Sequence, residues 1–161
     1  MTAVQERLYV EAPYVQTVGV FERRLGIPSG ADHGECELTL GLPVGKDREI
    51  ARAVQANTQR LASTGNYTSR YRVAWEAGRT VRGIPTPAFE GTLTISAGED
   101  YDETALQIDG SYDPPGGPAG RAFDELIGRR ITHATMSALL AGIGDDLRAA
   151  HAQIEADKQP H

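Results

Sequence analysis

Residues 106–124, LQIDGSYDPPGGPAGRAFD, contain the sharpest change of pattern in this chain of 161 residues. Leu106, Ile108 and Tyr112 alternate with polar residues, which is the period of a strand with one buried face. The alternation ends at the Pro-Pro-Gly-Gly run of residues 114–117, and an apolar repeat of about 3.6 residues follows it. The stretch therefore predicts a last strand over residues 104–112, a turn and a long C-terminal helix, with the rest of the sheet built by the residues before it.

The composition is that of one globular domain, residues 1–161, with 24% charged and 40% hydrophobic residues. A formal net charge of -6 disfavours a nucleic-acid partner, because phosphate binding needs a basic surface. Cys36 is the only cysteine, so no intrachain disulfide can form and a reducing compartment is the default. No segment has the apolar length of a signal peptide or a membrane span. We expect a cytoplasmic protein that does not insert into a membrane.

Alternation of apolar and polar residues predicts further strands before this stretch, at residues 7–12, 37–42, 67–76 and 89–97. A short helix is predicted over residues 14–25, with Gly26 as its C-terminal stop. Its stripe is formed by Val15, Val18, Phe21 and Leu25. Residues 26–36 are interpreted as a loop.

Residues 46–63 fit two interpretations. A weak helical stripe joins Ile50, Val54, Asn57 and Leu61, whereas a period of two puts Ile50, Val54, Ala56 and Thr58 on one face. The turn chemistry of residues 63–66, STGN, favours a hairpin. Arg52 and Arg60 would then share that face and need an anionic partner such as Glu90, Asp109 or a ligand carboxylate, unless their face is the solvent face.

The C-terminal helix is predicted over about residues 119–157 and has two apolar stripes. One contains Phe123, Ile127, Ile131, Ala134 and Ala138, and the other contains Met136, Leu140, Ile143, Leu147 and Ile154. A helix apolar on two sides is buried on two sides, or it bends, here near Gly142 and Gly144. One side could pack against a short helix or a second subunit, so a homodimer is one alternative.

Three motifs carry a resemblance to a known family: Trp75-Glu76-Ala77, PAFEGTL at 87–93, and TALQIDGSYDPPGGPAG at 104–120 followed by Asp124. Together they resemble the SRPBCC superfamily of START-like lipid-binding domains, polyketide cyclases and aromatases. The resemblance implies an α+β helix-grip fold, in which a bent antiparallel sheet wraps around a long C-terminal helix. It also implies an internal cavity that usually takes a hydrophobic or aromatic small molecule. The superfamily has no universal catalytic motif.

The cavity should be lined by the apolar alternation of the sheet. These ligand-binding candidates are Tyr71, Val73, Trp75, Phe89, Leu93, Leu106, Ile108 and Tyr112. Each of them could equally be core that packs against the helix. Tyr112 is the most informative, because its hydroxyl group either points at a ligand or satisfies a backbone group.

No catalytic residue is assigned, and the weak candidates are Tyr112, His133 and Arg130. His133 could act as a general acid or base if it faces the cavity, but its charged neighbours favour the surface. His151 and His161 are expected in an exposed tail.

A cluster of metal-binding side chains occurs at Asp32, His33, Glu35 and Cys36, but its spacing matches no zinc pattern. We interpret it as a polar loop and expect neither a metal nor a cofactor.

The leading functional hypothesis is binding of a small hydrophobic or aromatic molecule. The alternative is a polyketide cyclase or dehydratase, which requires at least two titratable groups to converge in the cavity. A third hypothesis is a structural or regulatory module that dimerises through the two-sided helix.

Overall fold

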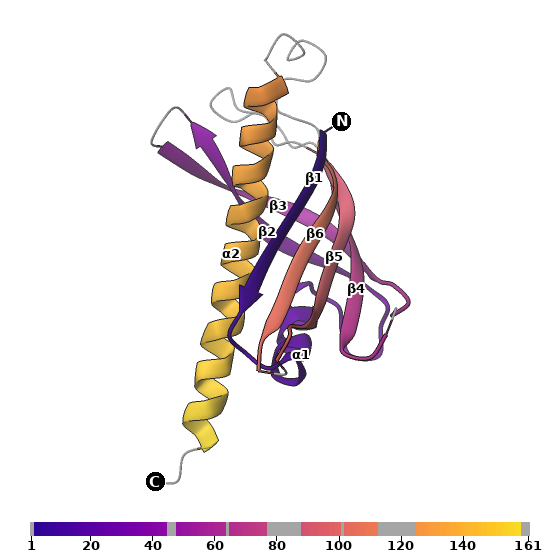
Figure 1. Cartoon of the computed structure of the whole chain (residues 1–161). Helices are drawn as coiled ribbons and strands as arrows, with labels where there is room; N and C mark the ends of the chain where they lie inside the picture. Colours follow the sequence, from indigo (N-terminus) through magenta and orange to yellow (C-terminus); the bar gives the residue numbers. More distant parts are fainter. Residues whose placement is uncertain are drawn as a thin grey trace.

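The computed structural model describes residues 2–44, 48–63, 65–76, 88–100, 102–112 and 125–158. These residues form six strands and two helices (Figure 1). In chain order they are β1 (Thr2–Val10), α1 (Tyr14–Arg24), β2 (His33–Val44), β3 (Arg48–Arg60), β4 (Thr68–Trp75), β5 (Phe89–Ala97), β6 (Thr104–Tyr112) and α2 (Glu125–Lys158). No described helix has the length and apolar character needed to span a membrane.

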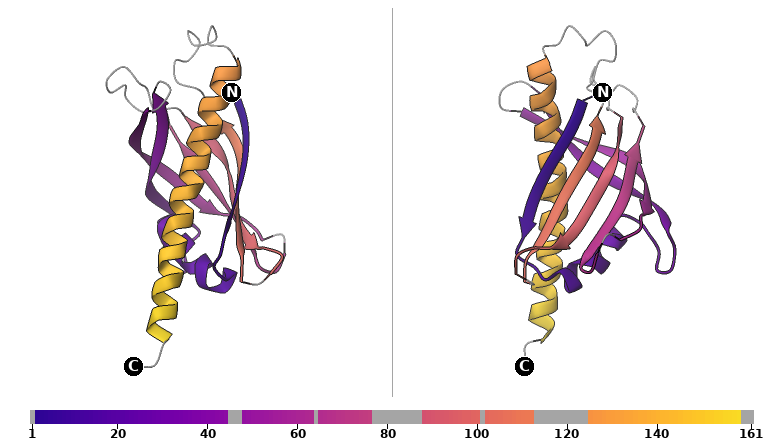
Figure 2. Two further views of the ribbon diagram at one scale, coloured as in Figure 1. Left: turned by 60° about the vertical axis from the view of Figure 1, so that its left-hand side comes forward. Right: turned by 45° about the vertical axis from the view of Figure 1, so that its right-hand side comes forward.

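The strands form one antiparallel sheet in the order β1-β6-β5-β4-β3-β2. Helix α2 packs mainly against β1 and β2, which are the two edge strands of this sheet. Figure 2 shows the consequence, with α2 lying across the open side of a curled sheet. The protein therefore has a mixed α+β fold, and its interior lies between α2 and the central strands.

The curl begins where β3 leaves β4. β3 pairs with β4 only through Asn57–Arg60, the last part of the strand, whereas its described pairing with β2 runs along the whole of β3. The β2–β3 pair can therefore swing away from β4 and reach α2 from the far side. The hairpin interpretation of residues 46–63 is confirmed by the strand at Arg48–Arg60, and the helical alternative is wrong because the two neighbouring strands pair with this segment.

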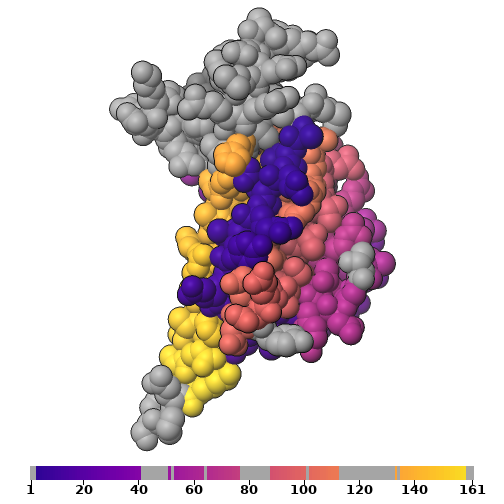
Figure 3. All heavy atoms as spheres, viewed as in Figure 1, coloured from indigo at the N-terminus to yellow at the C-terminus, as the bar shows by residue number. Residues whose placement is uncertain are grey.

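The two faces of the sheet differ in polarity. The inner face carries the buried apolar residues, and the outer face carries polar pairs such as Arg72 with Glu90 and Gln107 with Asp109. Figure 3 shows strands β1 and β6 side by side at the surface. This alternation is the pattern from which the strands were predicted, and the bounds of β5 and β6 agree with the prediction.

Two strands are longer than predicted. β1 begins at Thr2 rather than at residue 7, and β2 begins at His33 rather than at residue 37. The interpretation of residues 26–36 as a loop is therefore wrong for its last four positions. Their polar side chains hide the strand, but their backbone pairs with β3, as in the partnership of Cys36 with Ala56.

The predicted buried face of helix α1 is correct at Phe21 and Leu25 and wrong at Val15. Val15 is 70% exposed, whereas Thr17, Phe21 and Leu25 are buried and spaced four residues apart. Polar Thr17 stays inside because its hydroxyl group donates to the Tyr14 carbonyl and meets Thr104. Gly26 follows the helix with a φ of +72°, which confirms it as the C-terminal stop.

Helix α2 is continuous from Glu125 to Lys158, and the predicted start at residue 119 lies outside the described residues. The second predicted stripe is buried at Met136, Leu140, Ile143 and Leu147, which are at most 1% exposed, and half-buried at Ile154. The side chains of the first stripe lie outside the described residues, except for half-buried Ala138. The helix runs unbroken through Gly142 and Gly144. An added Cβ at Gly144 would lie 2.8 Å from Leu8 Cδ2, so this glycine lets α2 approach β1 closely.

Candidate functional site

Three aromatic residues stand next to one another across the sheet. Trp75 on β4 is the register partner of Phe89 on β5, which is in turn the partner of Tyr112 on β6. The rings of Trp75 and Phe89 are stacked, with centroids 4.7 Å apart and an interplanar angle of 26°. All three side chains are buried on the inner face. We call this set the aromatic row.

Two glycines make room beside the aromatic row. Gly91 and Gly110 are register partners, and an added Cβ on either would come within 2.8 Å of Phe89 Cζ. The same Cβ atoms would also come within 2.5 Å of backbone carbonyl oxygens on the neighbouring strand. The Phe89 ring therefore lies over bare backbone, which only glycine permits at this spacing.

Two buried hydroxyl groups at this end of the interior lack partners. Tyr112 Oη on β6 and Thr135 Oγ1 on α2 are buried, and neither makes a hydrogen bond in the described structure. They lie on elements that pack against each other, β6 and α2, and Thr135 lowers the pKa of Tyr112. In the described structure no hydrogen bond of normal geometry joins the two hydroxyl groups. We call them the hydroxyl pair.

The other buried threonines in the described residues all have hydrogen-bond partners for their hydroxyl groups. The hydroxyl group of Thr58 donates to the Leu25 carbonyl at 2.8 Å, and that of Thr104 donates to the Ala12 carbonyl at 2.6 Å. Thr17 is also paired. Thr135 alone among them has no partner, although a buried hydroxyl group is normally hydrogen-bonded.

The buried side chains in the described part of the chain carry no charge. Apart from tyrosine, the polar ones among them are four threonines. Burial raises the pKa of Tyr112 to about 12 although Thr135 lowers it, so the phenol keeps its proton at neutral pH. The pair therefore offers two neutral, buried hydrogen-bond donors.

All of the predicted ligand-binding residues are buried and share the inner face of the sheet: Tyr71, Val73, Trp75, Phe89, Leu93, Leu106, Ile108 and Tyr112. The buried stripe of α2 supplies the opposite wall. The alternative interpretation of Tyr112, that its hydroxyl group satisfies a backbone group, is wrong because that hydroxyl group has no partner in the described structure.

Tyr71 differs from Tyr112 because its hydroxyl group reaches a polar network at the edge of the interior. Tyr71 Oη donates to Glu22 Oε1 at 2.7 Å, and Arg60 binds the same carboxylate. Arg60 therefore pairs with Glu22 and Asp32, and the expected partners Glu90 and Asp109 are wrong for it. The side chain of Arg52 lies outside the described residues.

His133, the catalytic candidate on α2 whose side chain is described, does not join the hydroxyl pair. The His133 side chain is 69% exposed and its Nδ1 atom lies against the Glu6 carboxylate, which confirms the surface interpretation. The side chain of Arg130 and residue His161 lie outside the described residues. His151 is partly buried, and its Nδ1 atom lies 2.5 Å from Gln16 Oε1 on α1. The expectation of an exposed tail is therefore wrong for this residue.

The cluster of metal-binding residue types at residues 32–36 lies at the start of β2. Asp32 pairs with Arg60, and burial raises the pKa of the Cys36 thiol. Within the described part of the chain, no three His, Cys, Asp or Glu side chains are placed to hold a metal ion.

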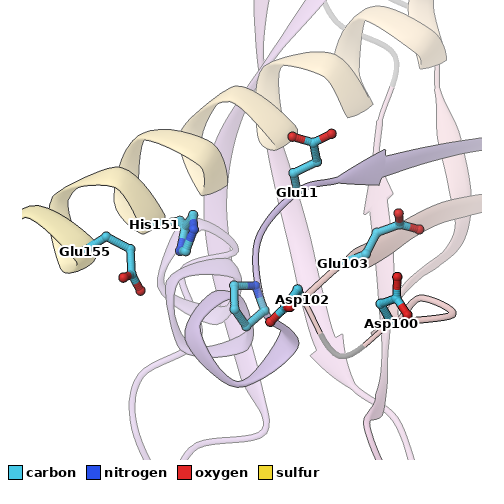
Figure 4. Close-up of a pocket in the computed structure, with 7 residues that line it drawn as sticks. Glu11, Asp100, Asp102, Glu103, His151 and Glu155 are labelled. Carbon is cyan, nitrogen blue, oxygen red and sulfur yellow. The ribbon is translucent and has the colours of Figure 1, made fainter.

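A surface groove of about 530 Å³ lies where β1, the β5–β6 turn and the end of α2 meet (Figure 4). It is lined by Glu11, Pro13, Asp100, Asp102, Glu103, His151 and Glu155. In Figure 4 the carboxylates point in different directions and do not converge on one point. The groove contains none of the predicted ligand-binding residues. In the sequence, the acidic residues Asp100, Asp102 and Glu103 are the feature that corresponds to this groove.

A comparison with solved structures matches the chain to the crystal structure of TTHA0849 from Thermus thermophilus. The TM-score is 0.52 and the identity is 12%, over 92% of this chain and 99% of that chain. At this identity the likeness shows the fold alone. No protein-family model matches the sequence, and no curated protein matches it.

Proposed function

We propose that this chain is a helix-grip protein of the SRPBCC superfamily, and that it binds a small hydrophobic or aromatic molecule between the sheet and α2. The observation that carries the proposal is the hydroxyl pair of Tyr112 and Thr135, buried without partners beside the aromatic row. The overall arrangement of sheet and helix supports it, since it is compatible with the fold that the sequence motifs imply.

The physical reason is the cost of an unmade hydrogen bond. A buried hydroxyl group without a partner costs about 1–3 kcal/mol, so a folded protein that keeps two of them together sacrifices stability there. A guest molecule that accepts hydrogen bonds from both would remove this cost. Residues that reduce stability in this way are concentrated at functional sites.

The enzymatic alternative finds less support. A cyclase or dehydratase needs two titratable groups that converge on the substrate. Among the described residues, Tyr112 is the one titratable group at the hydroxyl pair, because His133 is exposed and the Tyr71 hydroxyl group is engaged by Glu22. The dimer hypothesis relies on the first apolar stripe of α2, most of which lies outside the described side chains.

Trp75 provides a direct test, because it is the only tryptophan and belongs to the aromatic row. We expect fused-ring aromatic compounds to change its fluorescence with saturation at one molecule per chain, and to raise the melting temperature. Thr135→Leu, which adds bulk to the interior wall, should weaken this binding. Gly142→Ala, at an exposed position of the same helix, should leave it unchanged. Equal binding by both variants would contradict the proposed location.

A further inference from the structure

Resting on the proposed function, we propose that the ligand is electrically neutral and carries a carbonyl oxygen that accepts hydrogen bonds from both Tyr112 Oη and Thr135 Oγ1. The carbonyl is the polar end of the ligand, and the flat apolar remainder lies along the aromatic row. The chemical class is thus an aromatic or polycyclic ketone or ester, rather than a fatty acid or an amine.

The choice of a carbonyl follows from counting donors and acceptors. Each hydroxyl group of the pair has one hydrogen atom to donate, and neither has an acceptor in the described structure. A carbonyl oxygen has two lone pairs and no hydrogen of its own, so a single atom satisfies both donors. A ligand alcohol could also accept from both, but its own hydrogen atom would then need a third partner.

The exclusion of charge follows from the buried side chains of the described residues. No buried described side chain is charged, so a carboxylate there would be desolvated with only two neutral donors to stabilise it. An ammonium group would equally lack a carboxylate, because the acidic groups near the interior are engaged elsewhere: Glu22 binds Arg60 and Glu6 binds His133. A neutral group avoids both desolvation costs.

The aromatic row suits a flat body for the ligand. Trp75 and Phe89 stack on each other, and the neighbouring ring of Tyr112 bears the hydroxyl group at one end of the row. An aromatic ligand that extends this row places its carbonyl substituent at the Tyr112 end. Aromatic rings prefer such offset contacts, which add to the free energy gained by burial.

A matched set of naphthalenes tests the inference with the full-length protein. The probes are 2-acetylnaphthalene, 2-isopropylnaphthalene, 2-naphthoate and 1-(2-naphthyl)ethylamine at about pH 7.5, with dissociation constants measured by calorimetry. We expect the ketone to bind most tightly and the hydrocarbon to bind about tenfold more weakly. The carboxylate and the amine should bind at least about 100-fold more weakly than the ketone.

The outcomes separate the two proposals. If no probe binds, the proposed function itself is contradicted. If the hydrocarbon, the carboxylate or the amine binds as tightly as the ketone, the ligand-binding function stands and the neutral carbonyl is contradicted.

Variants of the hydroxyl pair locate the contact. Tyr112→Phe and Thr135→Val should each weaken binding of the ketone by about fivefold and leave binding of the hydrocarbon unchanged. Thr58→Val, which removes a buried hydroxyl group that already has a partner, should leave both affinities unchanged. The carbonyl carbon of the labelled ketone should move downfield in the NMR spectrum on binding, and this shift should be lost in the double variant. Unchanged ketone affinity in the double variant would mean that the pair holds only a water molecule, which would overturn the inference.

Discussion

Arg60 on β3 binds Glu22 on α1 at two points, through Nη2 to Oε2 at 2.8 Å and through Nε to Oε1 at 3.1 Å. Tyr71 Oη on β4 donates to the same Oε1 atom. One carboxylate therefore ties the short helix to two strands at the edge of the interior. Bidentate pairs of this kind fix geometry as well as adding stability. This network and the buried Phe21 both hold α1 in place.

Removing the charge of Glu22 should destabilise the fold. Glu22→Gln weakens charge-assisted hydrogen bonds from Arg60 and Tyr71, so we expect the free energy of unfolding in urea to fall by about 2 kcal/mol. Asp32→Asn is the matched control, because Asp32 meets the same arginine but is 75% exposed. An exposed pair contributes at most about 1 kcal/mol. Equal losses in the two variants would show that the network does not anchor α1.

The Glu22 carboxylate should also make the stability of the fold sensitive to acid. Burial raises the pKa of Glu22, but the hydrogen bonds from Arg60 and Tyr71 outweigh burial and leave the pKa below its ordinary value of 4.5. A lowered folded-state pKa adds stability that is present above about pH 4.5 and is lost as the pH falls through the folded value. Between about pH 7 and pH 3, wild-type protein should therefore lose more unfolding free energy than Glu22→Gln. Parallel pH profiles for the two proteins would refute this.

The two fully buried tyrosines should respond oppositely to loss of their hydroxyl groups. Tyr71→Phe removes a bond to a carboxylate and should cost about 1.5 kcal/mol of stability. Tyr112→Phe removes an unpartnered buried hydroxyl group, so the ligand-free protein should become more stable by about 1 kcal/mol. Thermal and urea unfolding of the two variants provide the measurement. A loss of stability in Tyr112→Phe would show that its hydroxyl group is satisfied in the free protein.

Two glycines with positive φ should differ in their tolerance of alanine. Gly26 has a φ of +72°, and an added Cβ would lie 1.9 Å from the Glu35 carbonyl oxygen. Gly30 has a φ of +82° but no atom within 4 Å of such a Cβ. Gly30→Ala should therefore cost only the backbone strain, about 1 kcal/mol. Gly26→Ala adds a backbone clash and should cost more than about 3 kcal/mol by urea unfolding. Equal costs would contradict the close crossing of the two segments.

The sequence predicted those parts of the fold whose signal is local. β5 and β6 have one buried face, so their alternation defines their bounds, and the inner-face residues followed directly. The predicted bounds of β2 were too short because its first residues are polar. These residues are held in the strand by pairing with β3, which a short stretch of sequence does not reveal. Val15 was predicted on the buried face of α1 because it is hydrophobic. Thr17 is buried there instead, because Thr104 gives its hydroxyl group a hydrogen-bond partner.

Only one residue of the hydroxyl pair could be predicted from the sequence, because the position of the other depends on packing between distant segments. Tyr112 ends a clear strand, so its inward orientation could be inferred from the alternation. Thr135 lies between His133 and Met136 in a stretch with no distinct polar signal, and only the packing of α2 against β6 brings it to Tyr112. The partnership of Arg60 with Glu22 joins residues 38 positions apart, and nothing in the spacing of either residue indicates it.

The central claim is that a neutral molecule binds between the sheet and α2, with its carbonyl oxygen at the hydroxyl pair of Tyr112 and Thr135. The most direct measurement is a crystal structure of the protein with 2-acetylnaphthalene. The account predicts density for one molecule between the sheet and α2, with its carbonyl oxygen within about 3 Å of both hydroxyl oxygens. An interior filled by the protein's own side chains, with the ketone found only at the outer surface or in the acidic groove, would contradict it.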